Sequence, residues 1–197
     1  MKPDQNTTES LQTMSKVSIS GNASGTGVFT IQAPNSNVDR VLSLPDEAGT
    51  VLTSASTANF PAGSVLQVVN AEYNTSVSTS SISTVDTGLS ASITPTSASS
   101  KILVLVSQTL TPSAVGSDTY SKVEVVRDST PIVLDQRMNN YIRYNHNVWS
   151  CCKLDSPATT STLTYKTKMA TGSSGFPVEA QHANLRTSFI TLMEIAG

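Results

Sequence analysis

The amino-acid sequence predicts an all-β fold: a small intertwined β-collar near the N-terminus, then a β-sandwich of jelly-roll type, in a trimer. Ser and Thr are abundant, at 31 and 26 residues, whereas only 13% of the chain is charged. Hydroxyl side chains suit the wet face of a sheet. Apolar and polar residues alternate in many short segments bounded by Gly, Pro, Asn or Asp, as in strands with one dry face. No segment of the sequence has the apolar period of a strongly amphipathic helix.

Residues 1–16 are polar and have no hydrophobic period, which is typical of a terminal tail. The apolar side chains available for contacts near this end are Leu11, Met14, Val17 and Ile19. We therefore interpret 1–16 as a docking segment that a neighbouring protein holds. It either lies extended along that partner or forms a single helical turn at Leu11 and Met14.

Residues 17–61 contain three short apolar pieces, 28–31, 41–44 and 50–53, at a spacing of about ten residues. Each is too short for a helix and is flanked by turn-forming residues. Three strands of this length bury too little apolar surface to make a core of their own. We expect copies of the same chain to cover them, so that 17–61 forms the intertwined collar of a homotrimer.

Residues 62–197 come after a connector of small residues and are expected to form the β-sandwich head. Eight strands joined by turn-rich links fit a jelly roll. The segment 101–111 is the most apolar, so we expect a central strand buried on both faces. Within 62–197 a helical turn is plausible only at 136–144. The predicted strands are 64–77, 87–94, 101–111, 120–128, 131–136, 142–154, 159–169 and 185–195.

The collar region carries a resemblance to a known family. Its pattern, G-x-G-x-F-T-I-x-A-P and then R-x-L-x-L-P and G-T-V-L, is formed by Gly25, Gly27, Phe29, Ile31, Pro34, Arg40, Leu42, Leu44, Pro45, Gly49, Thr50, Val51 and Leu52. This pattern resembles a segment of tail-fibre and other adhesin-like virion proteins of tailed bacteriophages, and residues 60–69 resemble the start of the next segment in those proteins. The resemblance covers about residues 20–70 and is looser over 71–197. It implies a virion structural role, which in that family includes tail fibres, adaptors and capsid-surface proteins.

From the resemblance we expect a short trimeric tail fibre or fibre-like appendage that contacts the host surface, with 1–16 docked on other virion proteins. The alternative is a capsid decoration or cement protein that stabilises the phage head. A free glycan-binding module of a bacterium is a third class, which the lack of an apolar export-signal region near the N-terminus disfavours. We expect the protein in the virion after synthesis in the host cytoplasm.

Composition excludes several other partners. The net charge is −2 and the 12 basic residues are scattered, so there is no electrostatic footprint for nucleic acid. No apolar stretch of about 18 residues occurs, so we expect no membrane insertion. The Gly- and Ser-rich run at 172–175 lacks the Lys of a phosphate-binding loop. We therefore expect no cofactor.

The cysteines, Cys151 and Cys152, are adjacent. Neighbouring Cα atoms lie about 3.8 Å apart, below the roughly 4.4–6.8 Å of a disulfide, and on a strand the two side chains point to opposite faces. We expect two reduced thiols, one of them buried. His146 and His182 could join them as zinc ligands, but the short fixed offsets of paired ligands are absent. The sequence therefore predicts no metal site.

Catalysis is not expected either. The chain has no G-x-S-x-G nucleophile elbow. Glycan hydrolysis needs two carboxylates flanking the bond, and 197 residues are few for the large β-helix of polysaccharide-cutting tail spikes. The carboxylates available in the head are Asp118, Glu124, Asp128, Asp135, Asp155 and Glu179.

The best candidate for host contact is a region rich in Tyr, Asn and Arg at 137–150. Aromatic faces stack on sugar rings, while Arg and Asn donate hydrogen bonds to hydroxyls. The residues concerned are Arg137, Asn139, Asn140, Tyr141, Arg143 and Tyr144. In the competing interpretation, which we favour, Trp149 and one of the tyrosines lie in the core and the Asn residues belong to loops. A further alternative places Tyr141, Tyr144 and Trp149 in the trimer interface.

Overall fold

The computed structural model describes residues 24–28, 30, 35–39, 41, 43, 48, 60–112, 120–139, 146–173 and 175–197. The chain divides into two units, Met1–Glu47 and Ala48–Gly197, and each is considered by itself. Among its described residues the first unit has no strand, and Val28 and Val41 are each 91% exposed. Most of the predicted collar lies outside the described residues, as does the docking segment 1–16. A single chain does not test a collar built from three, so both stay predictions.

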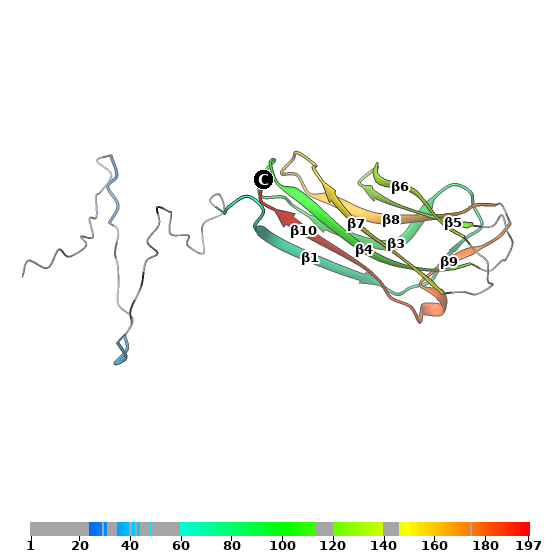
Figure 1. Ribbon diagram of the computed structural model, residues 1–197, viewed down its shortest axis with the longest axis horizontal. Helices are drawn as coiled ribbons and strands as arrows, with labels where there is room; N and C mark the ends of the chain where they lie inside the picture. The colour runs from blue at the N-terminus through cyan, green and yellow to red at the C-terminus, as the bar shows by residue number, and fades with distance from the viewer. Residues whose placement is uncertain are drawn as a thin grey trace, which may run out of the picture. The chain divides into compact units, whose positions relative to one another are not determined.

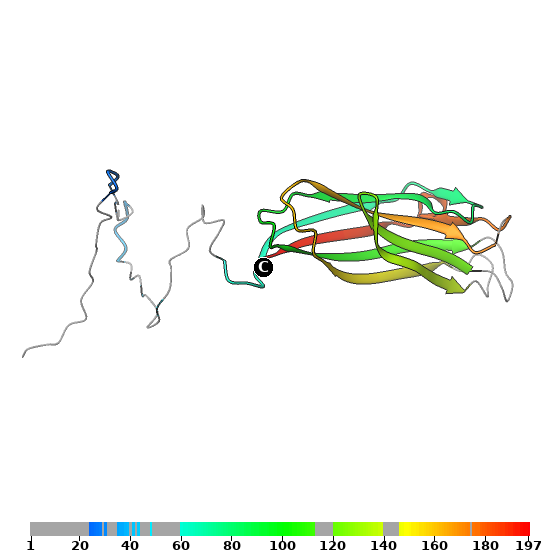
Figure 2. The same cartoon turned by 90° about the horizontal axis from the view of Figure 1, so that it is seen from above.

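The second unit is a two-layered β-sandwich (Figures 1 and 2). In sheet A, strands β1, β10, β4, β9 and β2 lie in that order and β7 pairs with β4. Sheet B has the order β3, β8, β5, β6, and every pairing is antiparallel. The elements are β1 (Val65–Tyr73), β2 (Val77–Thr79), β3 (Val85–Ile93), β4 (Lys101–Pro112), β5 (Tyr120–Arg127), β6 (Thr130–Asn139), β7 (Asn147–Asp155), β8 (Leu163–Thr171), β9 (Val178–Ala180), the 3₁₀ turn η1 (His182–Asn184) and β10 (Ser188–Ile195).

The strand pairing is nested along the chain. Strand β1 pairs with β10, β3 with β8, β4 with β7, and β5 with β6. The short pair β2–β9 belongs to sheet A, as β1–β10 does, and from there inward the pairs alternate between the two sheets, as in one long hairpin folded over itself. This is the wrapping of a jelly roll. The predicted all-β sandwich is therefore confirmed for the second unit.

Alternation along each strand builds the core, because successive side chains point to opposite faces of a sheet. In β3 the inward Leu89, Ala91 and Ile93 are buried, whereas Ser90 and Ser92 between them are exposed. The inward side chains of both sheets form two apolar clusters. The larger one comprises Leu89, Ala91, Ile93, Ile102, Val104, Val106, Val125, Leu163, Tyr165, Ile190 and Leu192, and the smaller one Leu110, Val123, Met169, Val178 and Ala180.

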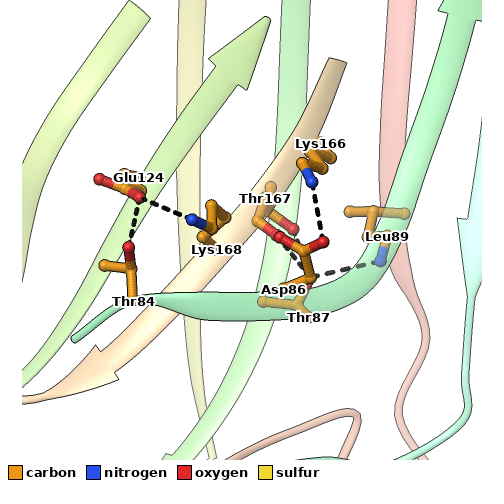
Figure 3. Close-up of polar contacts among 8 residues, drawn as sticks. All are labelled: Thr84, Asp86, Thr87, Leu89, Glu124, Lys166, Thr167 and Lys168. Carbon is orange, nitrogen blue, oxygen red and sulfur yellow. Dashed lines mark hydrogen bonds and ion pairs between the residues drawn. The ribbon is translucent and has the colours of Figure 1, made fainter. Parts of the chain in front are cut away.

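A buried polar layer separates these two clusters. The layer contains Gln108 of β4 and Thr167 of β8. Along its strand, each of them lies between one inward residue of the larger cluster and one inward residue of the smaller cluster. Thr167 Oγ1 lies 2.5 Å from Thr87 Oγ1, its neighbour in Figure 3, and donates to Gln108 Oε1 at 2.7 Å. Gln108 Nε2 in turn donates to Ser188 Oγ at 2.9 Å. These hydrogen bonds join the two sheets and satisfy groups that would otherwise be costly to bury.

All eight strands predicted for the head are present, with different ends for some. Strand β8 begins at Leu163 rather than 159, since Leu163 pairs with the last residue of β3. Strand β10 begins at Ser188 rather than 185, since Ser188 pairs with the last residue of β1. Earlier residues have no strand to pair with among the described ones. The possible helical turn at 136–144 is wrong for residues 136–139, which belong to β6.

The prediction that 101–111 is buried on both faces is wrong, although its central position is right. Strand β4 pairs with β10 on one side and with β7 on the other. Its inward residues, such as Val104, are buried, whereas Leu103 and Leu105 are only partly buried. In a two-layered sandwich each sheet has one face covered by the other sheet, and nothing within the described residues fully covers the other face of β4.

In strand β1 one residue, Val65, lies on a different face from the one that the sequence predicts. Val65, Val69, Ala71 and Tyr73 share one face in a regular strand, but the register shifts between Val65 and Gln67. A β-bulge of this kind turns the residues before it to the other face. Val65 therefore lies on the outside of sheet A and is half exposed, while the other three pack against the core.

Candidate interaction surfaces

The outer face of sheet B is polar and charged (Figure 3). Lys166 Nζ lies 2.8 Å from Asp86 Oδ2, joining β8 to β3. Lys168 Nζ lies 3.9 Å from Glu124 Oε1, which also accepts from Thr84 Oγ1 at 2.7 Å. Cross-strand pairs of opposite charge and of hydroxyls are the usual way in which a sheet faces water.

The outer face of sheet A is different. Val68 of β1 lies beside Met193 of β10, Met193 beside Leu103 of β4, and Leu103 beside Leu154 of β7. These four apolar side chains form one row across four strands, and Val68 and Leu154 are 55% and 48% exposed. We call the outward surface of β1, β10, β4 and β7 the apolar face; its apolar side chains are Val65, Val68, Leu103, Leu105, Val148, Cys152, Leu154, Phe189, Met193 and Ile195.

The remaining outward positions of the apolar face are mostly small and neutral. Thr191 Oγ1 accepts from Asn70 Nδ2 at 2.7 Å. Among the described residues of these four strands, the outward side chains with a formal charge are Glu72 of β1 and Lys101 of β4. They lie toward opposite ends of the face, with the apolar row between them.

The structure describes only part of the predicted host-contact region. Arg137 lies exposed on β6, and its guanidinium carbon is 4.7 Å from the centre of the Tyr120 ring. Asn139 ends β6, where its backbone pairs with Tyr120. Asn140, Tyr141, Arg143 and Tyr144 lie outside the described residues, so their role in host contact stays a prediction.

Tyr120 is a residue of this region that the sequence interpretation missed. Two cationic side chains, Lys122 and Arg137, lie near its ring. Lys122 Nζ is 5.8 Å from the ring centre, and Lys122 of β5 faces outward on the same side as Arg137 of β6. A Cβ on Gly172 would come within 2.6 Å of the ring, so the glycine makes room for it. The alternation of 120–128 places Tyr120 and Lys122 on one face, but nothing local pairs them with Arg137.

Trp149 belongs to the interior side of β7. It is partly buried and packs against both apolar clusters. This agrees with the interpretation that Trp149 is structural. Its neighbours on β7 alternate as a strand requires: Cys151 packs against the larger cluster and Cys152 is exposed on the apolar face.

The two thiols are free and differ in chemistry. Burial, together with the adjacent Cys152 sulfur, raises the pKa of Cys151 to about 11. Because the thiolate is the reactive form, Cys151 is a poor nucleophile at neutral pH. Cys152 has the exposure that a reagent needs.

Three carboxylates of the sandwich are tied into hydrogen bonds that join strands. Asp155 Oδ2 of β7 accepts from Tyr165 Oη at 2.8 Å and from Arg127 Nη1 at 2.5 Å, which links sheet A to sheet B. Burial favours the neutral form of Glu194, but hydrogen bonds from Gln67 and Thr96 lower its pKa below the ordinary value. Such carboxylates hold the fold together.

Glu179, the third, lies at the end of the sandwich beside two histidines. Burial alone would raise the pKa of Glu179, but hydrogen bonds from Ser76, His182 and the Ala183 N–H together lower it. The rings of His182 and His146 have centres 5.2 Å apart. In the part of the chain that the structure describes, no three His, Cys, Asp or Glu side chains come together as a metal site requires.

A shallow pocket of about 250 Å³ lies at the other end of the sandwich. It is lined mainly by hydroxyl side chains and backbone, with Phe60 and Leu66 as its large apolar side chains. Within the described residues, no helix has the length and hydrophobicity that crossing a membrane requires.

Comparison with known proteins gives no family. No family model matches the chain, and no curated protein matches it. Among solved structures, a chain of infectious bursal disease virus, Gt strain, is similar at 13% identity with a TM-score of 0.41, covering 76% of this chain and 42% of that chain. The VP2 subviral particle of the same virus is similar at 13% identity with a TM-score of 0.37, covering 66% of this chain and 38% of that one. This chain thus spans less than half the length of either, and likenesses of this strength carry no conclusion about function.

Proposed function

We propose that the chain is a structural virion protein of a tailed bacteriophage, most specifically a short trimeric tail fibre or fibre-like appendage that contacts the host surface. The observation that carries the proposal is the resemblance of residues 20–70 to virion appendage proteins. The jelly-roll pairing of the head supports it by analogy, because jelly rolls are frequent in viral capsid and lectin domains.

The chemistry of the described side chains is in keeping with a structural role. The carboxylates Asp155, Glu179 and Glu194 each accept two or more hydrogen bonds from other parts of the fold. Lys166 and Lys168 are paired with carboxylates across strands. Groups committed to holding strands together are not free to act as acids, bases or nucleophiles.

Electron microscopy of particles labelled with a gold-conjugated antibody against the head tests the proposal. Label on the tail is the expected result. Label spread over the capsid would instead assign the alternative, a decoration or cement protein. Particles without label or protein would overturn the virion assignment.

Removal of residues 1–16 tests the docking segment separately. The truncated chain is expected to remain folded and trimeric but to be missing from purified particles, because its contacts with other virion proteins are gone. Normal incorporation of the truncated chain, measured by quantitative mass spectrometry of particles, would contradict this part of the proposal.

Host contact has its own variants. Tyr141→Ala with Tyr144→Ala is expected to reduce adsorption of particles to host cells while the trimer stays intact, because the aromatic stacking surface is lost. Ser92→Ala, on the outer face of sheet B, is the matched control and should adsorb normally. Loss of the trimer, or unchanged adsorption, would mean that the two tyrosines are structural.

A further inference from the structure

We propose that the apolar face of sheet A is the surface through which copies of this chain meet. The proposal rests on the trimer of the proposed function and names the contact inside it. The evidence comes from the sandwich itself: the residues on the face, its area, its charges and the edge strand beside it.

The residues are those of an association surface. Interface centres are depleted in charge, and the contacts between identical copies are more apolar than the rest of the surface. The row formed by Val68, Met193, Leu103 and Leu154 runs unbroken across four strands. The same chain builds a charged, ion-paired outer face on sheet B, so composition alone does not account for an apolar one.

The area of the face is that of a large exposed apolar patch. Four strands about 4.8 Å apart, with about eight residues each at roughly 3.4 Å, span on the order of 500 Å². That equals the largest apolar patches of soluble monomers, roughly 300–600 Å². A stable interface takes about 800 Å² from each partner. The face by itself is therefore smaller than the share of one partner in a standard interface, so a stable contact between copies has to include its borders as well.

Strand β7 supplies such a border. Among the described strands only β4 pairs with it, and that pairing runs from Ile102 and Asp155 to Leu110 and Asn147 without a shift in register. The other long edge strands, β1, β3 and β6, each carry a shift in register. Bulges, Pro, short length and charged side chains are the usual protection of free edges. Strand β7 carries the exposed apolar side chains Val148 and Leu154, so it extends the apolar face, whereas its exposed Lys153 is a charge of the kind that limits edge-to-edge pairing. The contact is therefore expected to use the face of β7 and not its edge.

The charges and side chains point to a copy of the same chain as the occupant. Glu72 and Lys101 leave the face neutral, so like faces approach without net repulsion. A polyanion would need a cationic surface. A sugar would need exposed aromatic rings, and among the described residues of the apolar face only Phe189 is aromatic. In a trimer the three apolar faces turn toward the threefold axis, where each packs against apolar side chains of its two neighbours.

Sedimentation of the full-length chain tests the proposal. The double variant Val68→Asp with Leu154→Asp is expected to be monomeric where the wild type is a trimer, because the collar strands bury too little apolar surface to hold three copies together without the heads. Its circular dichroism spectrum should be unchanged, because both side chains are already about half exposed. The matched control Ser90→Asp with Ser92→Asp places two carboxylates on the outer face of sheet B and should remain trimeric. A trimeric Val68→Asp, Leu154→Asp variant, or a monomeric wild type, would overturn the proposal.

The Cys152 thiol provides a second readout that does not depend on folding of a variant. Cys152 lies beside Leu105 on the apolar face, so association should protect it. Alkylation by iodoacetamide, assigned to one cysteine by mass spectrometry, is expected to be at least about tenfold slower in the wild type than in the double variant. Equal rates with a trimeric wild type would place the contact on another surface and overturn the proposal. A protected thiol in a monomeric wild type would mean that the chain's own N-terminal residues cover the face, which also overturns it.

These outcomes are independent of the particle experiments. A chain that is missing from particles but becomes monomeric in the double variant contradicts the virion assignment and leaves the contact standing. A chain that is found on tails but remains trimeric in the double variant supports the virion assignment and contradicts the proposed contact.

Discussion

The outer faces of sheets A and B come from the same chain and from strands of similar length, yet they are built for different surroundings. On sheet B, Lys166 and Lys168 are matched with Asp86 and Glu124. On sheet A, the corresponding positions hold Val, Leu and Met in register. The comparison teaches that alternation alone does not tell how a face is used: both sheets have one face in the core, but the second face is charged and ion-paired on sheet B and apolar on sheet A.

The largest expected effect is a difference in the free energy of unfolding between substitutions on the two sides of β4. Ile102 is fully buried in the core, whereas its neighbour Leu103 lies on the apolar face. Ile102→Ala should lower the free energy of unfolding by about 2–5 kcal/mol, because a cavity is added to the lost transfer energy. Leu103→Ala, made in the monomeric Val68→Asp, Leu154→Asp background, should cost about 1 kcal/mol or less. Urea denaturation measures both, and equal losses would mean that the two faces of β4 are equally packed.

The next largest effect is a difference in stability between substitutions on the two sides of β8. Thr167→Val removes the donor to Gln108 inside the polar layer, and leaving that buried amide short of a partner should cost about 1–3 kcal/mol. Thr164→Val removes a hydroxyl pair with Ser92 on the exposed outer face and should change stability by no more than about 0.5 kcal/mol. Thermal unfolding of the two variants compares them. An unchanged melting temperature for Thr167→Val would show that the polar layer adds little to stability.

Acid is expected to destabilise the fold by protonating Glu194, the inward carboxylate of β10. Hydrogen bonds keep the pKa of Glu194 below its ordinary value, so the folded chain binds fewer protons there than the unfolded chain. This stabilisation is present above the ordinary pKa of about 4.3 and is lost as pH falls through the lowered folded value. The melting temperature should therefore drop as the pH is lowered below about 4, and Glu194→Gln should shrink that drop, leaving the part due to Glu179. An undiminished drop in the variant would assign the acid sensitivity to other groups.

The smallest effect is expected on the outer face of sheet B. Asp86→Asn breaks the pair with Lys166, but both side chains are partly exposed to water, at 52% for Asp86 and 31% for Lys166. Exposed ion pairs contribute about 0–1 kcal/mol, and salt screens them. The variant should therefore lose little stability at low salt and none at high salt, measured by urea denaturation. A larger loss would mean that this face is covered in the assembly after all.

Much of the head could be predicted from the sequence, because a strand has a local period of two. The alternation of Leu89, Ala91 and Ile93 with hydroxyl residues predicts both β3 and its buried side, and the apolar run at 101–111 predicts the central β4. The adjacent cysteines likewise predict one thiol facing the core and one facing outward. The candidate host-contact region was proposed from composition, and the structure describes only Arg137 and Asn139 of its six residues.

Only the tertiary structure decides which strands become neighbours. Leu103 is part of an apolar row only because Met193 and Leu154, about ninety and fifty residues away, lie beside it. Val65 faces outward because of one bulge, and Arg137 meets Tyr120 because β6 pairs with β5. The physical reason is that side-chain period is a property of a few consecutive residues, set by backbone sterics. Pairing, register and the covering of a second face depend on contacts between distant segments, for which the chain carries no local mark.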